Sequence, residues 1–222
     1  MTSYIVLGRE VEMPVQVRRS RAAMGVFSVD AAAAQRTIDY SGHAIRKYRP
    51  NRGLCALTFI RYEDGDLGPY NEFGVVFPVS GGVLIHRLPV DGEFTMMAGR
   101  QIWGFPKELA DFDVSYGSKF TGRLSQHGQE ILRLDIAPGI RAPGAIFARP
   151  LDAFSCLNEV SRTTSWTMTP GAVRTRPGGA RLSLGDHPLA HELRGLGLGR
   201  RALLTTHMPR LRMEFGDAVR TP

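Results

Sequence analysis

Lysine is the residue type in this sequence that most directly suggests chemistry, because the chain uses it so rarely. Of its 28 basic residues, 25 are arginine and only Lys47, Lys107 and Lys119 are lysine. Lys47 lies in the basic run IRKYRPNR and Lys119 follows the turn-like SYGS, so both are expected at the surface. Lys107 lies in IWGFPKELADF, between bulky apolar residues. An amine in such surroundings can act as a nucleophile toward a carbonyl group.

Nucleophilic work by Lys107 requires its amine to lose a proton. A lysine with the ordinary pKa of about 10.4 is a free amine in about one molecule in 2,500 at pH 7, so the pKa has to fall by roughly three units. Burial among apolar groups disfavours the charged form and acts in that direction. The alternative interpretation is a lysine that lays its aliphatic stem over apolar surface and keeps its ammonium group in water.

Three other motifs resemble functional sites, but each lacks an essential part. His187 and His191 have the i, i+4 spacing of two metal ligands on a helix, without an apparent third ligand. The glycines from Gly195 to Gly199 lack the spacing of a phosphate-binding loop, and the carboxylates from Asp64 to Glu72 miss the ligand positions of a calcium loop. No G-x-S-x-G motif is present, so standard hydrolase chemistry is not expected.

The composition bounds the kind of protein that holds these residues. The chain has 222 residues, is 43% hydrophobic and 22% charged, and contains 25 glycines and 14 prolines, which predicts a folded protein of one large domain or two small ones. Cys55 and Cys156 belong to no C-x-x-C pair, which favours a reducing compartment. No signal peptide and no apolar run of about 18 residues are visible, so a cytoplasmic protein is expected.

The net charge of +7 and the pI near 9.9 raise the question of nucleic-acid binding. The arginines are scattered along the chain, and no recognition-helix, zinc-finger or aromatic RNA-binding motif lies among them. Nucleic acid is therefore not expected as a partner. A membrane is not expected either, because the sequence has no long uninterrupted apolar run.

The pattern of residues predicts mostly strands, with a few short helices. A helix is expected to begin at the N-cap residue Asp30 and to end at Gly42. Turn residues then separate a series of β-rich runs that are typical of consecutive hairpins. These runs are Leu54 to Tyr62, Asn71 to Val79, Gly82 to Val90, Glu93 to Ile102, Lys119 to Gln126, and Gln129 to Ala137.

Further strands are predicted from Thr164 to Val173, from Ala180 to Leu184 and from Ala202 to Phe215, and a short helix from Pro188 to Arg194. The stretch from Ala137 to Gly144 is expected to be a loop. Because the strands follow one another through short turns without a recurring β-α-β spacing, the sequence predicts a mainly β (α+β) protein built as an antiparallel barrel or sandwich.

Two segments resemble the acetoacetate decarboxylase family. AGRQIWGFPKEL, from Ala98 to Leu109, is similar to the family's active-site signature, in which a glycine-arginine pair leads to an aromatic residue, a proline and a lysine. LGPYNEFGVVFPV, from Leu67 to Val79, is similar to a second motif that carries an active-site glutamate. The resemblance runs from about Pro14 to Val219. It implies a single domain over residues 1–222, built as the family's antiparallel β-barrel or cone, and a homo-oligomer.

The resemblance also implies a reaction. Lys107 would form a Schiff base with a small 3-oxo acid, which would then lose CO2 through an enamine without a metal or organic cofactor. Glu72 would transfer protons or orient the carbonyl group, and Arg100 would contact the substrate or brace the loop. The remaining expected substrate-binding residues are Met97, Trp103, Phe105 and Arg19.

Some positions depart from the family pattern. Glu108 stands where the family's best-known decarboxylase has a second lysine, and an ungapped count back from Glu72 puts Leu57 where the family has another glutamate. The family's N-terminal arginine corresponds to Arg19 or Arg21. These departures keep the imine-forming lysine and favour an alternative: aldol, dehydration or cyclisation chemistry on a larger oxo acid. A further alternative is a non-catalytic barrel that binds a small ligand or an acidic partner.

Overall fold

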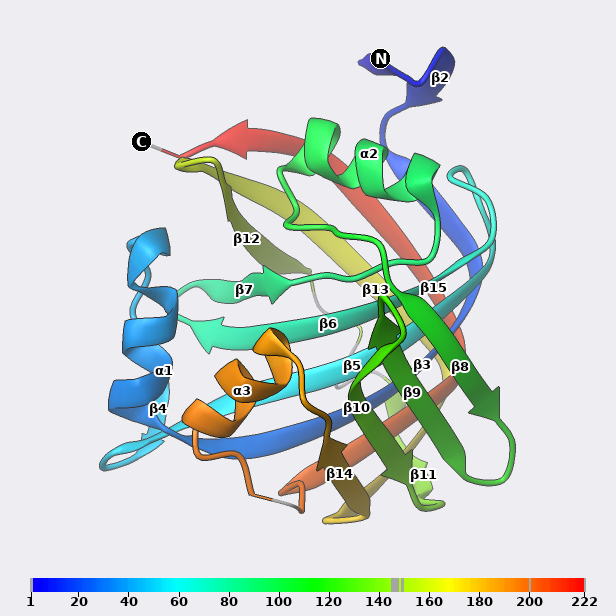
Figure 1. Cartoon of the computed structure of the whole chain (residues 1–222). Coiled ribbons are helices and arrows are strands. Elements are labelled where there is room, and N and C mark those ends of the chain that lie inside the picture. Colours follow the sequence, from blue (N-terminus) through cyan, green and yellow to red (C-terminus); the bar gives the residue numbers. More distant parts are fainter. Residues whose placement is uncertain (1, 145–147, 149, 200, 222) are drawn as a thin grey trace.

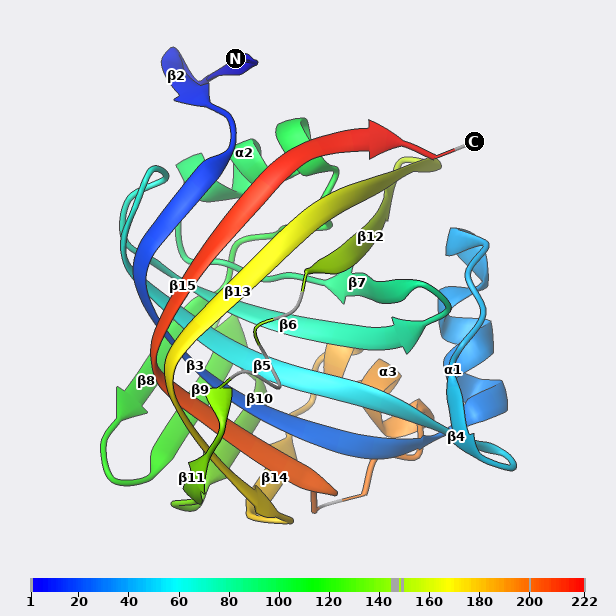
Figure 2. The same ribbon diagram turned by 180° about the vertical axis from the view of Figure 1, so that it is seen from behind.

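The computed structural model describes residues 2–144, 148, 150–199 and 201–221 (Figure 1). Its central element is a barrel of seven strands, closed where the last strand pairs with β13 (Figure 2). In ring order the strands are β13 (Val160–Pro177), β12 (Leu151–Leu157), β7 (Gly82–Arg87), β6 (Tyr70–Val79), β5 (Arg52–Gly65), β3 (Val15–Asp30) and β15 (Leu204–Arg220). All neighbours are antiparallel except β12 and β7, which pair in parallel. The predicted mainly β, antiparallel barrel is confirmed.

A second sheet packs on the outside of the barrel wall, in front of it in Figure 1 and behind it in Figure 2. Its strands, in order, are β14 (Ala180–Leu184), β10 (Gln129–Ile136), β9 (Phe120–Gln126) and β8 (Asp111–Tyr116). Three short pieces complete the strands: a hairpin of β1 (Ser3–Val6) and β2 (Arg9–Glu12), β4 (Lys47–Arg49) beside β5, and β11 (Ile140–Ala142) beside β13.

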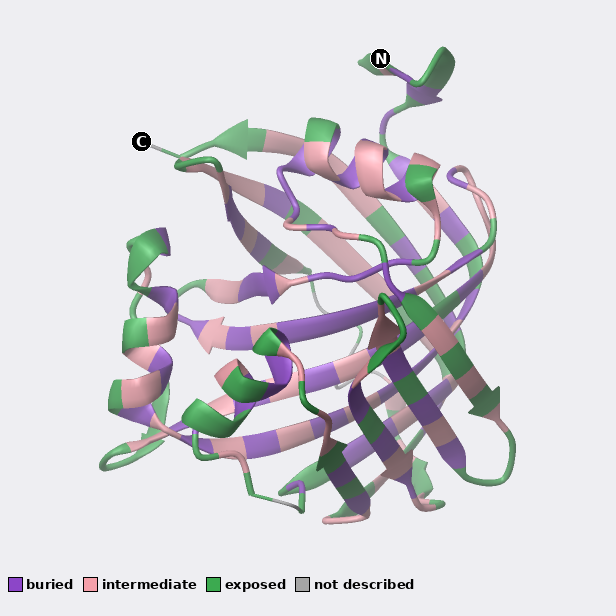
Figure 3. Ribbon diagram, in the orientation of Figure 1, coloured by how far each residue is buried: buried purple, intermediate pink, exposed green. Residues whose placement is uncertain are grey.

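Alternation along the barrel strands produces two apolar clusters. Their buried residues are among those coloured purple in Figure 3. On β6, Phe73 and Phe77 belong to the outer cluster, between the barrel wall and the second sheet. Tyr70 belongs to the inner cluster, inside the barrel, and Glu72 lies two residues further along the same face. The inner cluster holds the candidate site.

Helices α1 (Ala31–Ile38) and α3 (Pro188–Gly195) cover the outer cluster and agree with the sequence prediction. The Asp30 carboxylate accepts a hydrogen bond of 2.8 Å from Ala33 N and so caps α1. After α1 the chain continues as the 3-10 helix η1 (Asp39–Ser41) and ends at Gly42, whose φ of 71° is the left-handed conformation of a helix end.

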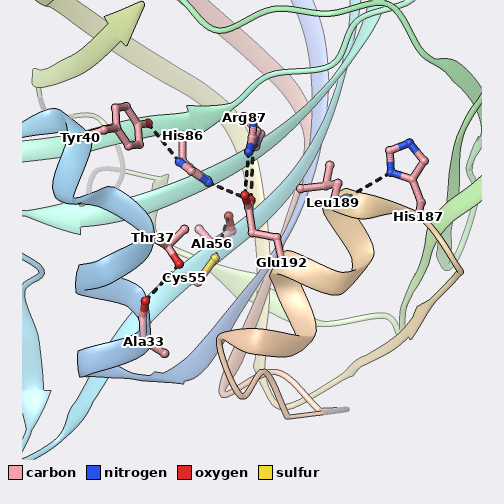
Figure 4. A network of polar contacts seen from close by, with 10 residues as sticks. All are labelled: Ala33, Thr37, Tyr40, Cys55, Ala56, His86, Arg87, His187, Leu189 and Glu192. Carbon is pink, nitrogen blue, oxygen red and sulfur yellow. Dashed lines mark hydrogen bonds and ion pairs between the residues drawn. The ribbon is translucent and has the colours of Figure 1, made fainter. Parts of the chain in front are cut away.

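A polar network ties these outer elements to the barrel wall (Figure 4). Glu192 of α3 lies 2.8 Å from His86 Nε2 and accepts a hydrogen bond of 2.7 Å from Arg87 Nη2, both on β7. His86 Nδ1 lies 3.0 Å from the hydroxyl of Tyr40, which belongs to η1. Burial raises the pKa of Glu192, but the hydrogen bonds from His86 and Arg87 outweigh it and lower the pKa to about 2.

The strand predicted from Glu93 to Ile102 is wrong, because this segment is the helix α2 (Glu93–Trp103). Its buried residues recur at helical spacing: Thr95, Ala98, Gly99, Ile102 and Trp103. Gly104, with φ of 63°, ends the helix. Helix α2 lies over the end of the barrel at the top of Figure 1 and packs into the inner cluster.

Two smaller expectations also change. The loop expected from Ala137 to Gly144 contains the strand β11, which pairs with β13. The barrel strands β3 and β12 were not predicted from the sequence.

Within the described ranges, no helix has both the length and the apolar character needed to cross a bilayer.

Candidate active site

Lys107 lies in the segment that follows α2, and backbone hydrogen bonds fix that segment beside residues 88–90. Leu88 N donates to Pro106 O at 3.3 Å, and Val90 N donates to Glu108 O at 2.9 Å. Arg100, on the last turn of α2, donates from Nη1 to Lys107 O at 2.9 Å. This hydrogen bond braces the loop through a carbonyl group, and Arg100 does not line the cavity described below.

The Lys107 side chain points into the barrel, where it is 2% exposed. Its Nζ lies 2.8 Å from Glu72 Oε2 and 3.5 Å from the hydroxyl of Tyr70. The same Nζ lies 4.9 Å from the centre of the Tyr70 ring. The structure therefore brings together the lysine and the glutamate that the sequence identified, as a buried ion pair.

Two tyrosines that the sequence analysis missed complete this group. Tyr62 on β5 stands directly opposite Tyr70 on β6, and their rings stack with centroids 4.1 Å apart and an angle of 11°. The Tyr62 hydroxyl donates to Glu72 Oε1 at 2.8 Å. Burial, reinforced by the charge of Glu72, raises the pKa of both tyrosines well above 10. Both hydroxyls therefore stay protonated at neutral pH and can act as hydrogen-bond donors.

A cavity that opens to solvent lies beside this group. Its charged lining residues are Lys107, Glu72 and Asp66. Asp66 is already held by the Arg18 guanidinium at 2.6 Å and by Gln16 N at 2.8 Å. Most of the remaining lining is aliphatic or aromatic, so a substrate carbonyl group at Lys107 would lie in apolar surroundings.

Only some of the other predicted substrate-binding residues line the cavity. Trp103 and Phe105 line the cavity, whereas Met97 packs in the inner cluster and is not part of the lining. Arg19 is 66% exposed at its side chain and pairs with Glu63 at 2.9 Å. Arg21 pairs with the same carboxylate at 2.7 Å, and neither arginine lines the cavity.

The two positions that depart from the family pattern also lie outside the cavity. Glu108 follows Lys107 in the chain but is not part of the lining. Leu57 belongs to the outer apolar cluster, on the far face of β5, and its neighbour Thr58 faces the cavity instead. A glutamate at position 57 of this backbone would therefore not reach Lys107.

The histidines at metal-ligand spacing have other partners. His187 Nδ1 accepts a hydrogen bond from Leu189 N at 3.2 Å and so caps α3, and His191 Nε2 lies 2.7 Å from Asp186 Oδ1. In the part of the chain that the structure describes, no three or more His, Cys, Asp or Glu side chains gather as metal ligands would.

Chemically, the site combines a primary amine, a carboxylate that contacts it, and a cavity that opens beside both. The carboxylate can accept a proton from the amine and return one to an oxygen atom bound nearby. The amine can then attack an electrophilic carbon in the cavity. Such an arrangement fits covalent catalysis on carbonyl compounds.

The chain also matches known proteins. The family model for acetoacetate decarboxylase (ADC) matches residues 7–220. Acetoacetate decarboxylase 1 of Bradyrhizobium diazoefficiens is 37% identical over 82 residues, which are 32% of this chain and 33% of that protein. The match therefore spans about a third of the curated relative's length.

Solved structures share the fold over nearly the whole chain. Acetoacetate decarboxylase from Legionella pneumophila superposes with a TM-score of 0.77 at 18% identity, covering 96% of this chain and 91% of its own. The enduracididine biosynthesis enzyme MppR, solved with pyruvate, gives a TM-score of 0.67 at 18% identity, covering 94% of this chain and 88% of its own.

Proposed function

Because this chain belongs to the acetoacetate decarboxylase family, we propose that it is a Schiff-base enzyme in which Lys107 condenses with the carbonyl group of an oxo acid. The observation that carries the proposal is the buried contact of 2.8 Å between Lys107 Nζ and Glu72 Oε2 at the cavity. A lysine that merely covered apolar surface would place its ammonium group in water, and this one does not.

The condensation needs only the substrate and the side chains of Lys107 and Glu72, and it releases one water molecule. Glu72 takes a proton from the Lys107 ammonium group, and the free Nζ attacks the carbonyl carbon. One proton then moves from the attacking nitrogen to the former carbonyl oxygen, which gives a neutral carbinolamine. Protonation of the carbinolamine oxygen by Glu72 lets it leave as water, and the nitrogen lone pair forms the C=N bond. The product is a protonated imine on Lys107 with Glu72 as its counter-ion.

For a 3-oxo acid, the protonated imine accepts the electrons of the bond to the carboxylate. That bond breaks, CO2 leaves, and the electron pair forms the C=C bond of an enamine. A proton then adds to the enamine carbon, and water hydrolyses the resulting imine to release the ketone and restore Lys107. In total, one 3-oxo acid anion and one proton give one ketone and one CO2.

A second candidate keeps the imine and replaces decarboxylation by aldol, dehydration or cyclisation chemistry. The observation that favours it is the charge of the cavity. Among the described lining residues, Lys107 is the only cation, and it already faces Glu72. The N-terminal arginines Arg19 and Arg21 pair with Glu63 instead. The carboxylate of a bound 3-oxo acid would thus meet no cationic side chain other than Lys107 among these lining residues.

Borohydride trapping tests the proposal. The protein is incubated with acetoacetate or with pyruvate, reduced with borohydride and mapped by mass spectrometry, while released CO2 is measured. Lys47 and Lys119 are exposed and serve as internal controls for non-specific adducts. An adduct on Lys107 with CO2 release supports the decarboxylase, and an adduct without CO2 supports the second candidate. No adduct at Lys107 with any oxo acid leaves a non-catalytic ligand-binding barrel.

A further inference from the structure

Four aromatic side chains form a continuous surface inside the cavity. We call Trp103, Phe105, Trp166 and Phe215 the aromatic wall, and all four line the cavity that holds Lys107. Trp103 stacks on Phe105 with centroids 5.7 Å apart, and Trp166 stacks on Phe215 with centroids 5.7 Å apart and an angle of 9°. Trp103 and Phe215, 5.8 Å apart, join the two pairs.

We propose that the substrate carries an uncharged apolar tail, a longer alkyl chain or an aryl group, that packs against the aromatic wall while its carbonyl carbon lies at Lys107. The inference rests on the proposed imine chemistry for the position of the carbonyl group. It adds a substrate class: hydrophobic oxo compounds rather than those of four carbons or fewer.

The two ends of the aromatic wall differ in burial, and this difference argues for a ligand. Trp103 and Phe105 are almost fully buried, as a role in shielding Lys107 from water requires. Trp166 and Phe215 are only half-buried although they lie in the same cavity. Shielding of Lys107 alone does not account for this accessible aromatic surface, whereas an apolar tail that displaced water from it would bind favourably.

The charges in the cavity exclude an ionised tail. Lys107 and Glu72 pair with each other, and the carboxylate of Asp66 is held by Arg18 and by a backbone amide. A charged group on the tail would therefore lose its water without meeting an unpaired charged side chain among the lining residues that the structure describes, which is strongly unfavourable.

A series of substrates with one head group and different tails tests the proposal. 3-Oxobutanoate, 3-oxohexanoate, 3-oxooctanoate and 3-oxo-5-phenylpentanoate present the same carbonyl and carboxylate groups to Lys107. We expect the second-order rate constant for borohydride-trapped imine at Lys107 to rise about fourfold for each buried CH2 group. Equal rates along the series, or rates that fall with tail length, would overturn the proposal.

A binding measurement separates the tail from the imine. The chain has two tryptophans, Trp103 and Trp166, and both belong to the aromatic wall, so intrinsic fluorescence reports its occupation. Secondary alcohols with the same tails cannot form an imine, and the Lys107→Met variant cannot form one with any ligand. We expect alcohol binding to the wild type and to this variant to tighten about fourfold per CH2.

The two experiments distinguish the two failures. Tail-dependent binding of alcohols without any trapped imine contradicts the proposed function and leaves the ligand class intact. Trapped imine without tail dependence contradicts the ligand class and leaves the proposed function intact.

A matched pair of variants locates the tail. In Trp166→Leu we expect the rate increase per CH2 to fall toward onefold, because the outer end of the aromatic wall is lost. In Ile140→Ala, a change at an exposed apolar residue outside the cavity, we expect the fourfold increase to persist. An equal rate increase per CH2 in both variants would show that the tail binds elsewhere and would overturn the proposal. If Trp166→Leu does not fold, the substrate series with the wild type still decides the question.

Discussion

The aliphatic stem of Lys107 lies directly against the backbone of Gly99 on helix α2, so closely that a Cβ atom on Gly99 would come within 2.6 Å of Lys107 Cε. Real Cβ atoms do not approach other atoms this closely. Gly99 belongs to a helix, where alanine is ordinarily favoured over glycine by about 0.5–1 kcal/mol. The close approach of the lysine gives a reason for glycine at this position.

The first prediction concerns Gly99→Ala. The methyl group has to displace the Lys107 stem, and overpacking of this kind costs about 1–3 kcal/mol, more than the helix gains from alanine. We expect a net loss of stability in denaturant unfolding and at least about a tenfold slower trapping of imine at Lys107, since small displacements of a reacting group cost large factors in rate.

Gly195→Ala is the matched control, because Gly195 is also helical and a Cβ atom there would have no neighbour within 4 Å. We expect this variant to unfold at an equal or higher denaturant concentration than the wild type and to trap imine at the wild-type rate. If the two glycine variants behaved alike, Gly99 would not position the lysine.

The second prediction is a double-mutant cycle on the buried ion pair. Lys107→Met and Glu72→Gln each leave one member of the pair without its partner, and such a loss costs about 3–5 kcal/mol when the remaining charge stays buried. The double variant removes both charges. We expect its free energy of unfolding to fall by at least about 1 kcal/mol less than the sum of the two single losses. Additive losses would mean that the two side chains do not interact.

The general fold could be predicted because its signals are local. Turn residues between Val79 and Gly82 mark a hairpin, and period-two alternation marks its strands. The segment of helix α2 resembles a strand because Phe94, Thr95 and Ile102 are residue types common in strands. The helical spacing of its buried residues, together with the helix-ending Gly104, is the better signal. The parallel contact of β12 with β7 has no local signal, since it joins segments far apart in the chain.

Some residues of the candidate site could likewise be predicted from the sequence, and others could not. Lys107 and Glu72 could be identified because each stands in a motif that resembles a known family. Tyr62 could not, because its contact with Glu72 depends on the register between β5 and β6, which sets Tyr62 opposite Tyr70. The position of Arg19 away from the cavity has a related cause: the register of β3 with β5 shifts on both sides of this residue, which alters the alternation that would aim its side chain.

The third prediction concerns the hydrogen bond of 2.8 Å from the Tyr62 hydroxyl to Glu72. Tyr62→Phe keeps the ring and its stacking and removes only this donor to a buried carboxylate. Hydrogen bonds to charged groups contribute about 1.5–3 kcal/mol, so we expect a loss of that size in denaturant unfolding. Imine trapping should slow as well, because the carboxylate loses the contact that fixes its second oxygen.

Tyr116→Phe is the control for that variant. The Tyr116 hydroxyl is buried and has no hydrogen-bond partner among the described residues. Removing an unsatisfied buried polar group does not destabilise a protein, so this variant should match or exceed the wild type in stability. A loss as large as that of Tyr62→Phe would show that removal of any buried hydroxyl, rather than the contact with Glu72, is responsible.

The last prediction concerns acid stability, which depends on the network in Figure 4. The pKa of Glu192 is about 2 in the folded protein and 4.5 without the fold. The unfolded chain therefore binds this proton more readily, so the stabilisation is fully present above pH 4.5 and is lost as the pH falls through about 2. After allowance for partial exposure, we expect the lowered pKa of Glu192 to contribute about 2 kcal/mol to the free energy of unfolding.

Glu192→Gln should lower the free energy of unfolding at pH 7 and flatten its decrease between about pH 4.5 and pH 2. Asp186→Asn changes a carboxylate that is 96% exposed and should leave the acid profile unchanged. If Glu192→Gln retained the wild-type slope, other carboxylates would control the acid transition, and the contact of α3 with β7 would not depend on the charge of Glu192.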